Sequence, residues 1–181
     1  KGKFIETEQS FFEEGVATLM DFTIDQHNEC RFMYILPVSK TKALIEFTIF
    51  SENLLEKEEY ETELNNYIDE KLKYHAYKVT EEEFGVIPMY NQPFIKKINP
   101  HVFNIGTNGG ASKASTGFTF HFIQEESKQL IAHLKKHPTL SNYNPKSKGR
   151  FQFYDDVFLR VLREKKVPAF YLFNCMFRKL P

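Results

Sequence analysis

The sequence predicts an α+β fold, in which an antiparallel or mixed sheet is followed by strands that alternate with helices. Residues 15–24, 31–38 and 42–50 are rich in β-branched and aromatic side chains, and residues 60–72 carry an apolar stripe at helical spacing. The composition, 41% hydrophobic and 27% charged over 181 residues, excludes a disordered chain. No apolar run reaches the roughly 20 residues that a membrane-spanning helix needs.

The three early segments are expected to be successive antiparallel strands. The connection at 39–41, which follows Pro37, is short enough for a hairpin between the second and the third. Since successive side chains of a strand point to opposite faces, the third strand should divide its residues between two faces. One face takes Ile45, Phe47 and Ile49, and the other takes Leu44, Glu46, Thr48 and Phe50.

An acidic amphipathic helix is expected next. Ser51 is its possible N-cap, and the acidic run 52–63 would form its solvated side. The apolar stripe of this helix consists of Tyr60, Leu64, Tyr67, Ile68 and Leu72. A further strand is expected at 77–89, followed by a loop that prolines interrupt and a short strand at 101–105.

Two more helices are expected in the rest of the chain. The first runs from about Thr116 to His137 and stops at Pro138. The second begins near Asp155 and Asp156, whose carboxylates suit the positive end of a helix dipole. Its buried side should contain Tyr154, Val157, Phe158, Val161 and Leu162.

The net charge of zero conceals a gradient along the chain. Residues 52–83 hold 4 basic and 11 acidic groups, whereas residues 84–181 hold 15 basic and 5 acidic ones. Basic and aromatic side chains alternate across 146–181, which is typical of a surface for anionic membranes, phosphate or nucleic acid, and equally of an ordinary solvated helix. Nucleic acid is not the expected partner, because no helix-turn-helix or RNA-binding aromatic motif accompanies the charge.

A glycine-rich segment separates the strand at 101–105 from the helix that follows. Four of the eight glycines lie there, at Gly106, Gly109, Gly110 and Gly117. A strand, a glycine-rich turn and a helix N-terminus in this order can present main-chain N–H groups to an anion or to the edge of an electron-rich ring. The segment matches no dinucleotide or P-loop fingerprint, so an ordinary strand-to-helix loop remains open.

Glu46 is the candidate for acid chemistry, because it lies in mid-strand among apolar neighbours. Burial would raise its pKa and keep it protonated, as a general acid acting on an apolar substrate requires. The alternative is an edge-strand glutamate that faces water. Tyr34 and Arg31 are its candidate hydrogen-bond or charge partners.

The remaining reactive side chains predict no metal site and no nucleophilic triad. His133 and His137 are spaced i, i+4, but their place at a lysine-rich helix end favours helix-terminal cations over metal ligands. Cys30 and Cys175 form no Cys-x-x-Cys pair, which favours a reducing compartment.

Four sequence blocks in register resemble the bacterial lycopene β-cyclase family. They are RFMYILP at 31–37, ALIEFTIFS at 43–51, GVIPM at 85–89, and the stretch from Ile105-Gly106-Thr107 to Ser115-Thr116-Gly117-Phe118. The resemblance extends over most of residues 4–180. It departs from the family pattern at Ala114 and Phe118, where members commonly have Pro and Tyr.

The resemblance implies a piece of a flavoprotein with the glutathione-reductase and hydroxylase-like fold. Residues 1–100 would form the substrate-binding sheet with its acidic helix, and residues 101–137 would close the FAD-binding domain. Residues 138–181 would be a helical basic and aromatic segment. The chain begins with Lys1 rather than Met and lacks the amino-terminal dinucleotide fingerprint, so we expect a fragment that is inactive and does not hold FAD alone.

The resemblance also implies an activity, an intramolecular isomerisation that closes β-ionone rings on the acyclic ends of lycopene with reduced FAD. By position Glu46 would be the acid catalyst. The cofactor contacts would be Gly106, Gly109, Gly110, Thr116 and Gly117. Candidate pocket residues are Tyr34, Phe47, Phe50, Phe118 and Phe120.

A C40 hydrocarbon dissolves in the bilayer, so the expected partners are the carotenoid and a membrane surface. We therefore expect a cytoplasmic protein, peripheral to the inner face of the membrane, with 146–181 as the docking segment. Two alternatives stay open. One is an FAD-dependent hydroxylase or polyprenyl reductase, and the other is a non-catalytic lipid-binding module.

Overall fold

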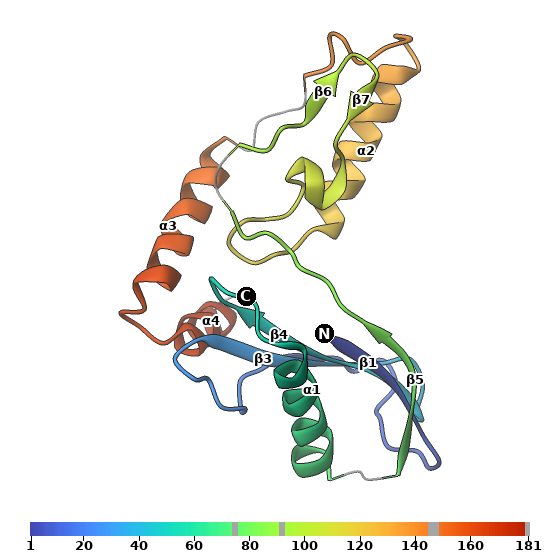
Figure 1. Ribbon diagram of the computed structural model, residues 1–181, viewed down its shortest axis with the longest axis vertical. Coiled ribbons are helices and arrows are strands. Elements are labelled where there is room, and N and C mark those ends of the chain that lie inside the picture. The colour runs from blue at the N-terminus through green and yellow to red at the C-terminus, as the bar shows by residue number, and fades with distance from the viewer. Residues whose placement is uncertain (74–75, 91–92, 145–148, 180–181) are drawn as a thin grey trace. The chain divides into compact units, whose positions relative to one another are not determined.

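The computed structural model describes residues 1–73, 76–90, 93–144 and 149–179. They form two compact units (Figure 1). The first unit consists of residues 1–85 and the segment that starts at Val167, and the second consists of residues 86–166. The predicted α+β class with an antiparallel sheet is confirmed.

The first unit is built on a five-stranded antiparallel sheet in the order β2-β3-β4-β1-β5. Its strands are β1 (Gly2–Thr7), β2 (Thr18–Asp21), β3 (Cys30–Pro37), β4 (Lys42–Phe50) and β5 (Tyr77–Glu83). The expected hairpin is β3 with β4. The strand expected at 15–24 is only four residues long, and the one expected at 77–89 ends at Glu83.

One face of this sheet packs against helix α1 (Lys57–Asn66), which continues as the π-helix η1 (Tyr67–Lys71) (Figure 1). We call it the α1 face. The sheet contributes Ile5, Met33, Ala43, Ile45 and Phe47, and the helices contribute Tyr60, Leu64, Tyr67 and Ile68. The predicted helical stripe and the predicted alternation along β4 are therefore both confirmed. Ser51 is not the N-cap, because the helix begins after Glu56, whose main-chain N–H donates to the Glu59 carboxylate (3.0 Å).

The opposite face carries a cluster of aromatic rings, and we call it the α4 face. Helix α4 (Ala169–Lys179) places Phe173, which is 2% exposed, against Phe22 and Phe50 with ring centroids 6.0 and 5.8 Å apart. Phe32 is fully buried and makes edge-on contacts with Tyr34 (5.3 Å) and Phe50 (5.2 Å). The basic segment at the chain end thus supplies core packing to the first unit.

The second unit begins with a short hairpin of β6 (Lys97–Asn99) and β7 (Val102–Phe103). The 3-10 helix η2 (Gly106–Gly109) and a series of turns lead to α2 (Phe120–Leu134), and α3 (Arg150–Glu164) follows. The helix expected from Thr116 therefore starts four residues later, because the chain is still turning at Gly117, where φ is +72°. In the described ranges, no helix is long and apolar enough to cross a membrane.

The start and the buried side of α3 differ from the prediction. The helix begins at Arg150, so Asp155 and Asp156 do not lie in its first turn. Tyr154 and Val157 are 59% and 47% exposed, while Asp155 is 4% exposed. The reason is a tertiary contact of Asp155, described below, which determines the side of the helix that packs.

Candidate active site

Glu46 lies at the centre of β4 on the α4 face of the sheet. Its cross-strand neighbours are Tyr34 on β3 and Gly2 on β1. The side chain is half-buried, and the Thr48 hydroxyl on the same face donates a hydrogen bond to Oε1 (3.1 Å). Glu46 is therefore neither an exposed edge glutamate nor a member of the closed core.

The surroundings of Glu46 favour its neutral form. Burial raises the pKa of this carboxyl group, the Thr48 hydrogen bond opposes the change, and the negative charge of Glu83 adds to it. Burial and the neighbouring Glu46 charge raise the pKa of Tyr34 to about 12, so its hydroxyl keeps its proton. A carboxylic acid held neutral beside apolar surface can donate a proton.

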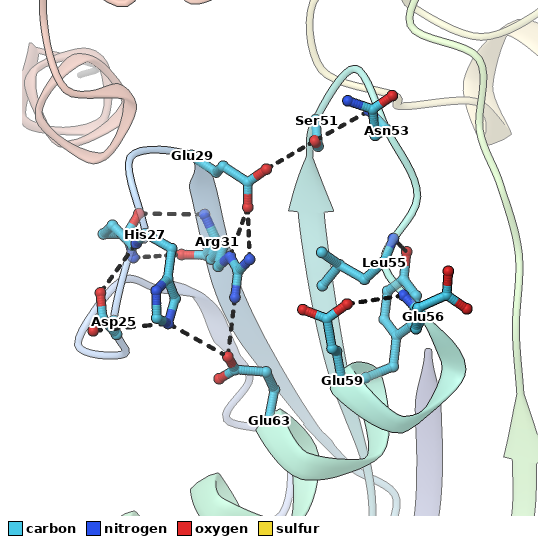
Figure 2. Close-up of polar contacts among 12 residues, drawn as sticks. Asp25, His27, Glu29, Arg31, Ser51, Asn53, Leu55, Glu56, Glu59 and Glu63 are labelled. Carbon is cyan, nitrogen blue, oxygen red and sulfur yellow. Dashed lines mark hydrogen bonds and ion pairs between the residues drawn. The ribbon is translucent and has the colours of Figure 1, made fainter.

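Arg31 is not a partner of Glu46. It lies opposite Ile49, on the α1 face, and its guanidinium is bound to Glu29 (2.7 Å) and Glu63 (3.0 Å) (Figure 2). The side chain is 7% exposed, and its contacts join the 25–29 turn and helix α1 to β3. Arg31 is on the other side of the sheet, so the prediction that it is a charge partner of Glu46 is wrong.

Three of the predicted pocket residues belong to the sheet of the first unit, and these three do not share one face. Tyr34 and Phe50 share the α4 face with Glu46. Phe47 points the other way and is fully buried beneath α1, so it does not line the surface beside Glu46. Phe118 and Phe120 belong to the second unit, where they are 54% and 70% exposed.

The glycine-rich segment is shaped largely by contacts within the chain. A Cβ at Gly109 would lie 2.3 Å from the Asn104 carbonyl oxygen, and one at Gly110 would lie 2.5 Å from the Phe94 ring. Gly106, Gly110 and Gly117 also have φ between +65° and +72°, which favours glycine. Close packing and positive φ angles within the chain therefore explain why glycines gather in this segment, without any ligand.

The start of helix α2 adjoins this segment. Thr119, the N-cap of α2, makes no side-chain capping bond, and the helix starts at Phe120, three residues after Gly117. Main-chain N–H groups at such an end suit an anion or the edge of a flavin ring. The 181-residue sequence contains no Gly-x-Gly-x-x-Gly fingerprint, the usual partner of such a contact in dinucleotide binding.

Asp155 connects helix α3 to the glycine-rich segment through its contacts with that segment. The sequence did not predict that Asp155 belongs to the site. Its Oδ1 accepts a hydrogen bond from the Ser115 hydroxyl (2.6 Å) and pairs with the Lys113 ammonium group. Asp155 and Ser115 are 4% and 5% exposed. The sequence offers one signal for such a contact, an Asp within an amphipathic helix. If that Asp lies on the packed side, its buried carboxylate needs partners.

His133 and His137 come together at the end of α2. The rings of His133 and His137 lie tilted to each other with centroids 4.5 Å apart, and His133 Nε2 contacts the Thr139 carbonyl (3.1 Å). In the part of the chain that the structure describes, no three His, Cys, Asp or Glu side chains gather as metal ligands. His133 lies in the last turn of α2, the position expected of a helix-terminal cation.

Comparisons with known proteins give one match. A family model described as lycopene cyclase protein matches residues 1–181, the whole sequence. The comparisons with curated proteins and with solved structures each found no match.

Proposed function

The chain belongs to the lycopene cyclase family, and on that premise we propose that Glu46 is the acid that starts ring closure on a carotenoid end group. The family places the chain in carotenoid biosynthesis, among enzymes of the lycopene cyclase type. The observation that supports Glu46 is its half-buried position on the aromatic α4 face, where burial raises its pKa.

The proposed reaction is an isomerisation without net oxidation. Glu46 donates its proton to the terminal alkene, which forms a C–H bond and leaves a carbocation. The neighbouring double bond attacks this cation and closes the ring, and loss of a ring proton restores an alkene. The rings of Tyr34 and Phe50 on the same face suit the cation, because aromatic faces attract positive charge.

The cofactor assignment forms part of the same proposal. The family is generally FAD-dependent, and in this chain Gly106, Gly109, Gly110, Thr116 and Gly117 would flank one edge of the flavin. Reduced flavin, when bound, would supply negative charge that suits a cationic intermediate. The chain's own residues supply main-chain donors at the start of α2 and the acid at Glu46.

The test is Glu46→Gln in the protein at its natural length. We expect cyclisation to fall at least about 10²-fold, since the amide cannot donate the proton, with flavin absorbance retained. Glu6→Gln is the matched control, because Glu6 lies on the same sheet face in an exposed pair with Lys42 (3.3 Å). Chromatography of products from lycopene gives the readout. Full cyclisation by the Glu46 variant would reject the acid and favour a hydroxylase, a reductase or a lipid-binding module.

We propose in addition a peripheral location at the inner face of the membrane, with docking through the basic and aromatic segment 146–181. In its described part, Phe151, Phe153 and Tyr154 of α3 are exposed, as are Lys165 and Lys166. Replacing both lysines by Glu should weaken flotation with anionic liposomes, because it reverses two charges. Unchanged flotation would count against this docking segment.

A further inference from the structure

A second carboxylate lies beside Glu46 because Gly2 has no side chain. In the register of the sheet, Gly2 pairs with Glu46 on β4 and with Glu83 on β5. All three positions therefore lie in one row across three strands and on one face, the α4 face. Any residue other than glycine at position 2 would place a side chain between the two glutamates.

The side chain of Glu83 occupies the space above Gly2. A Cβ built on Gly2 would lie 2.9 Å from Glu83 Cγ and 3.0 Å from Glu83 Oε1. The Glu83 charge also acts on Glu46, whose pKa it helps to raise.

The two carboxylates have different surroundings. Glu46 is half-buried and holds the Thr48 hydroxyl, whereas Glu83 is exposed at the end of the outermost strand of the sheet. Two titratable groups in such different environments can divide acid and base roles between them. The proposed cyclisation has an acid step and a base step, because one proton enters the substrate and another leaves it.

We infer that Glu83 is the base that removes the ring proton after Glu46 has donated its own. This inference rests on the proposed function. Glu46 loses a proton to the alkene and becomes a carboxylate, and the Glu83 carboxylate takes the ring proton as the C–H electron pair forms the new double bond. The substrate is isomerised, and one proton has moved from Glu46 to Glu83.

The enzyme returns to its starting state when that proton goes back. Glu83 is exposed to water and lies over Gly2 next to Glu46, so the proton can return across Gly2 or through solvent. No oxidant, reductant or further reactant is needed. Gly2 acts as a positioning residue, since its lack of a side chain brings the two carboxylates together.

The experiment compares Glu83→Gln with Glu81→Gln in the protein at its natural length, supplied with lycopene under reducing conditions. Glu81 is the matched control because it lies on the same strand and face and is also exposed, but pairs with Phe4. We expect Glu83→Gln to lower turnover about 10²-fold. It should also raise the share of hydrated products, which form when water captures a cation that is not deprotonated in time.

A second variant tests the position of Glu83 rather than its charge. Gly2→Ala keeps both carboxyl groups, but its Cβ would meet Glu83 Cγ and Leu44 Cδ1, each at 2.9 Å, so the side chains that cover Gly2 must shift. We expect the same increase in hydrated products. A merely structural role of Glu83 would not change the product ratio.

The outcomes separate this inference from the function on which it rests. If Glu83→Gln matches Glu81→Gln in turnover and product ratio while Glu46→Gln is inactive, the base is not Glu83 and the acid stands. If Glu46→Gln is fully active, the proposed function fails and the assignment of Glu83 fails with it.

Discussion

Replacing Asp155 should loosen the glycine-rich segment, by an amount that depends on the replacement. Asp155→Ala removes the acceptor of the Ser115 hydroxyl and the partner of the Lys113 ammonium group. Asp155→Asn keeps an oxygen that Ser115 can donate to and removes only the charge. We expect the alanine variant to be clearly the less stable of the two.

The magnitudes follow from burial. The Ser115 hydrogen bond joins two buried residues over 2.6 Å, and a hydrogen bond to a charged group contributes about 1.5–3 kcal/mol. The Lys113 side chain is 33% exposed, so its ion pair contributes less than about 1 kcal/mol and the freed ammonium group can reach water. The expected losses are about 2–4 kcal/mol for Asp155→Ala and about 1 kcal/mol for Asp155→Asn.

Hydrogen exchange of peptides that cover residues 106–119, read by mass spectrometry, measures this loss locally. Glu164→Gln is the control, because Glu164 lies on the same helix in exposed pairs with Arg160 and Lys166. It should leave exchange in the segment unchanged. If Asp155→Ala exchanges no faster than this control, or if the asparagine variant is as loose as the alanine variant, the reasoning is refuted.

The remaining predictions concern three other positions. The protonated form of Glu46 is the donor and its pKa is raised, so turnover should fall as pH rises through that raised pKa. Turnover that stays constant or increases across that range would contradict the acid role. Arg31→Met should lower the free energy of unfolding in urea by about 2–3 kcal/mol, because it removes the buried guanidinium to which Glu29 and Glu63 are bound. An unchanged unfolding midpoint would argue against this. Gly109→Ala should destabilise the protein by more than about 1 kcal/mol in a thermal scan, since its Cβ would meet the Asn104 carbonyl oxygen at 2.3 Å. Gly85→Ala is the control, because a Cβ at Gly85 would have nothing within 4 Å.

The sequence predicted the features of the first unit that depend on local periodicity. Alternation along β4 placed Glu46 and Phe47 on opposite faces, and the helical stripe placed Leu64 and Ile68 against the sheet. Both patterns arise because one side of each element is buried, so apolar side chains recur every 2 residues in a strand and every 3.6 residues in a helix. This periodicity does not identify which residues of neighbouring strands lie opposite each other. For that reason Arg31, which lies on the other face, was a wrong candidate partner for Glu46.

The features that the sequence did not reveal depend on contacts between distant residues. β1 is six residues long and contains Lys3 and Glu6, and it is held in place by β4 and β5, which follow much later in the chain. The packed side of α3 is determined by the contact of Asp155 with Ser115, 40 residues earlier. The proximity of Glu83 to Glu46 required the register of three strands, which hydrophobic pattern alone does not provide.

The first unit is assembled from two separate stretches of chain, and this has a consequence for its synthesis. The strand order places β1 between β4 and β5, and Phe173 of α4 completes the packing on the other face. A ribosome therefore translates residues 86–166, a continuous stretch that can fold as it emerges, before it delivers α4. Until then the rings of Phe22 and Phe50 lack their cover, so a nascent chain arrested before Val167 should be a preferred client of chaperones that bind exposed aromatic surface.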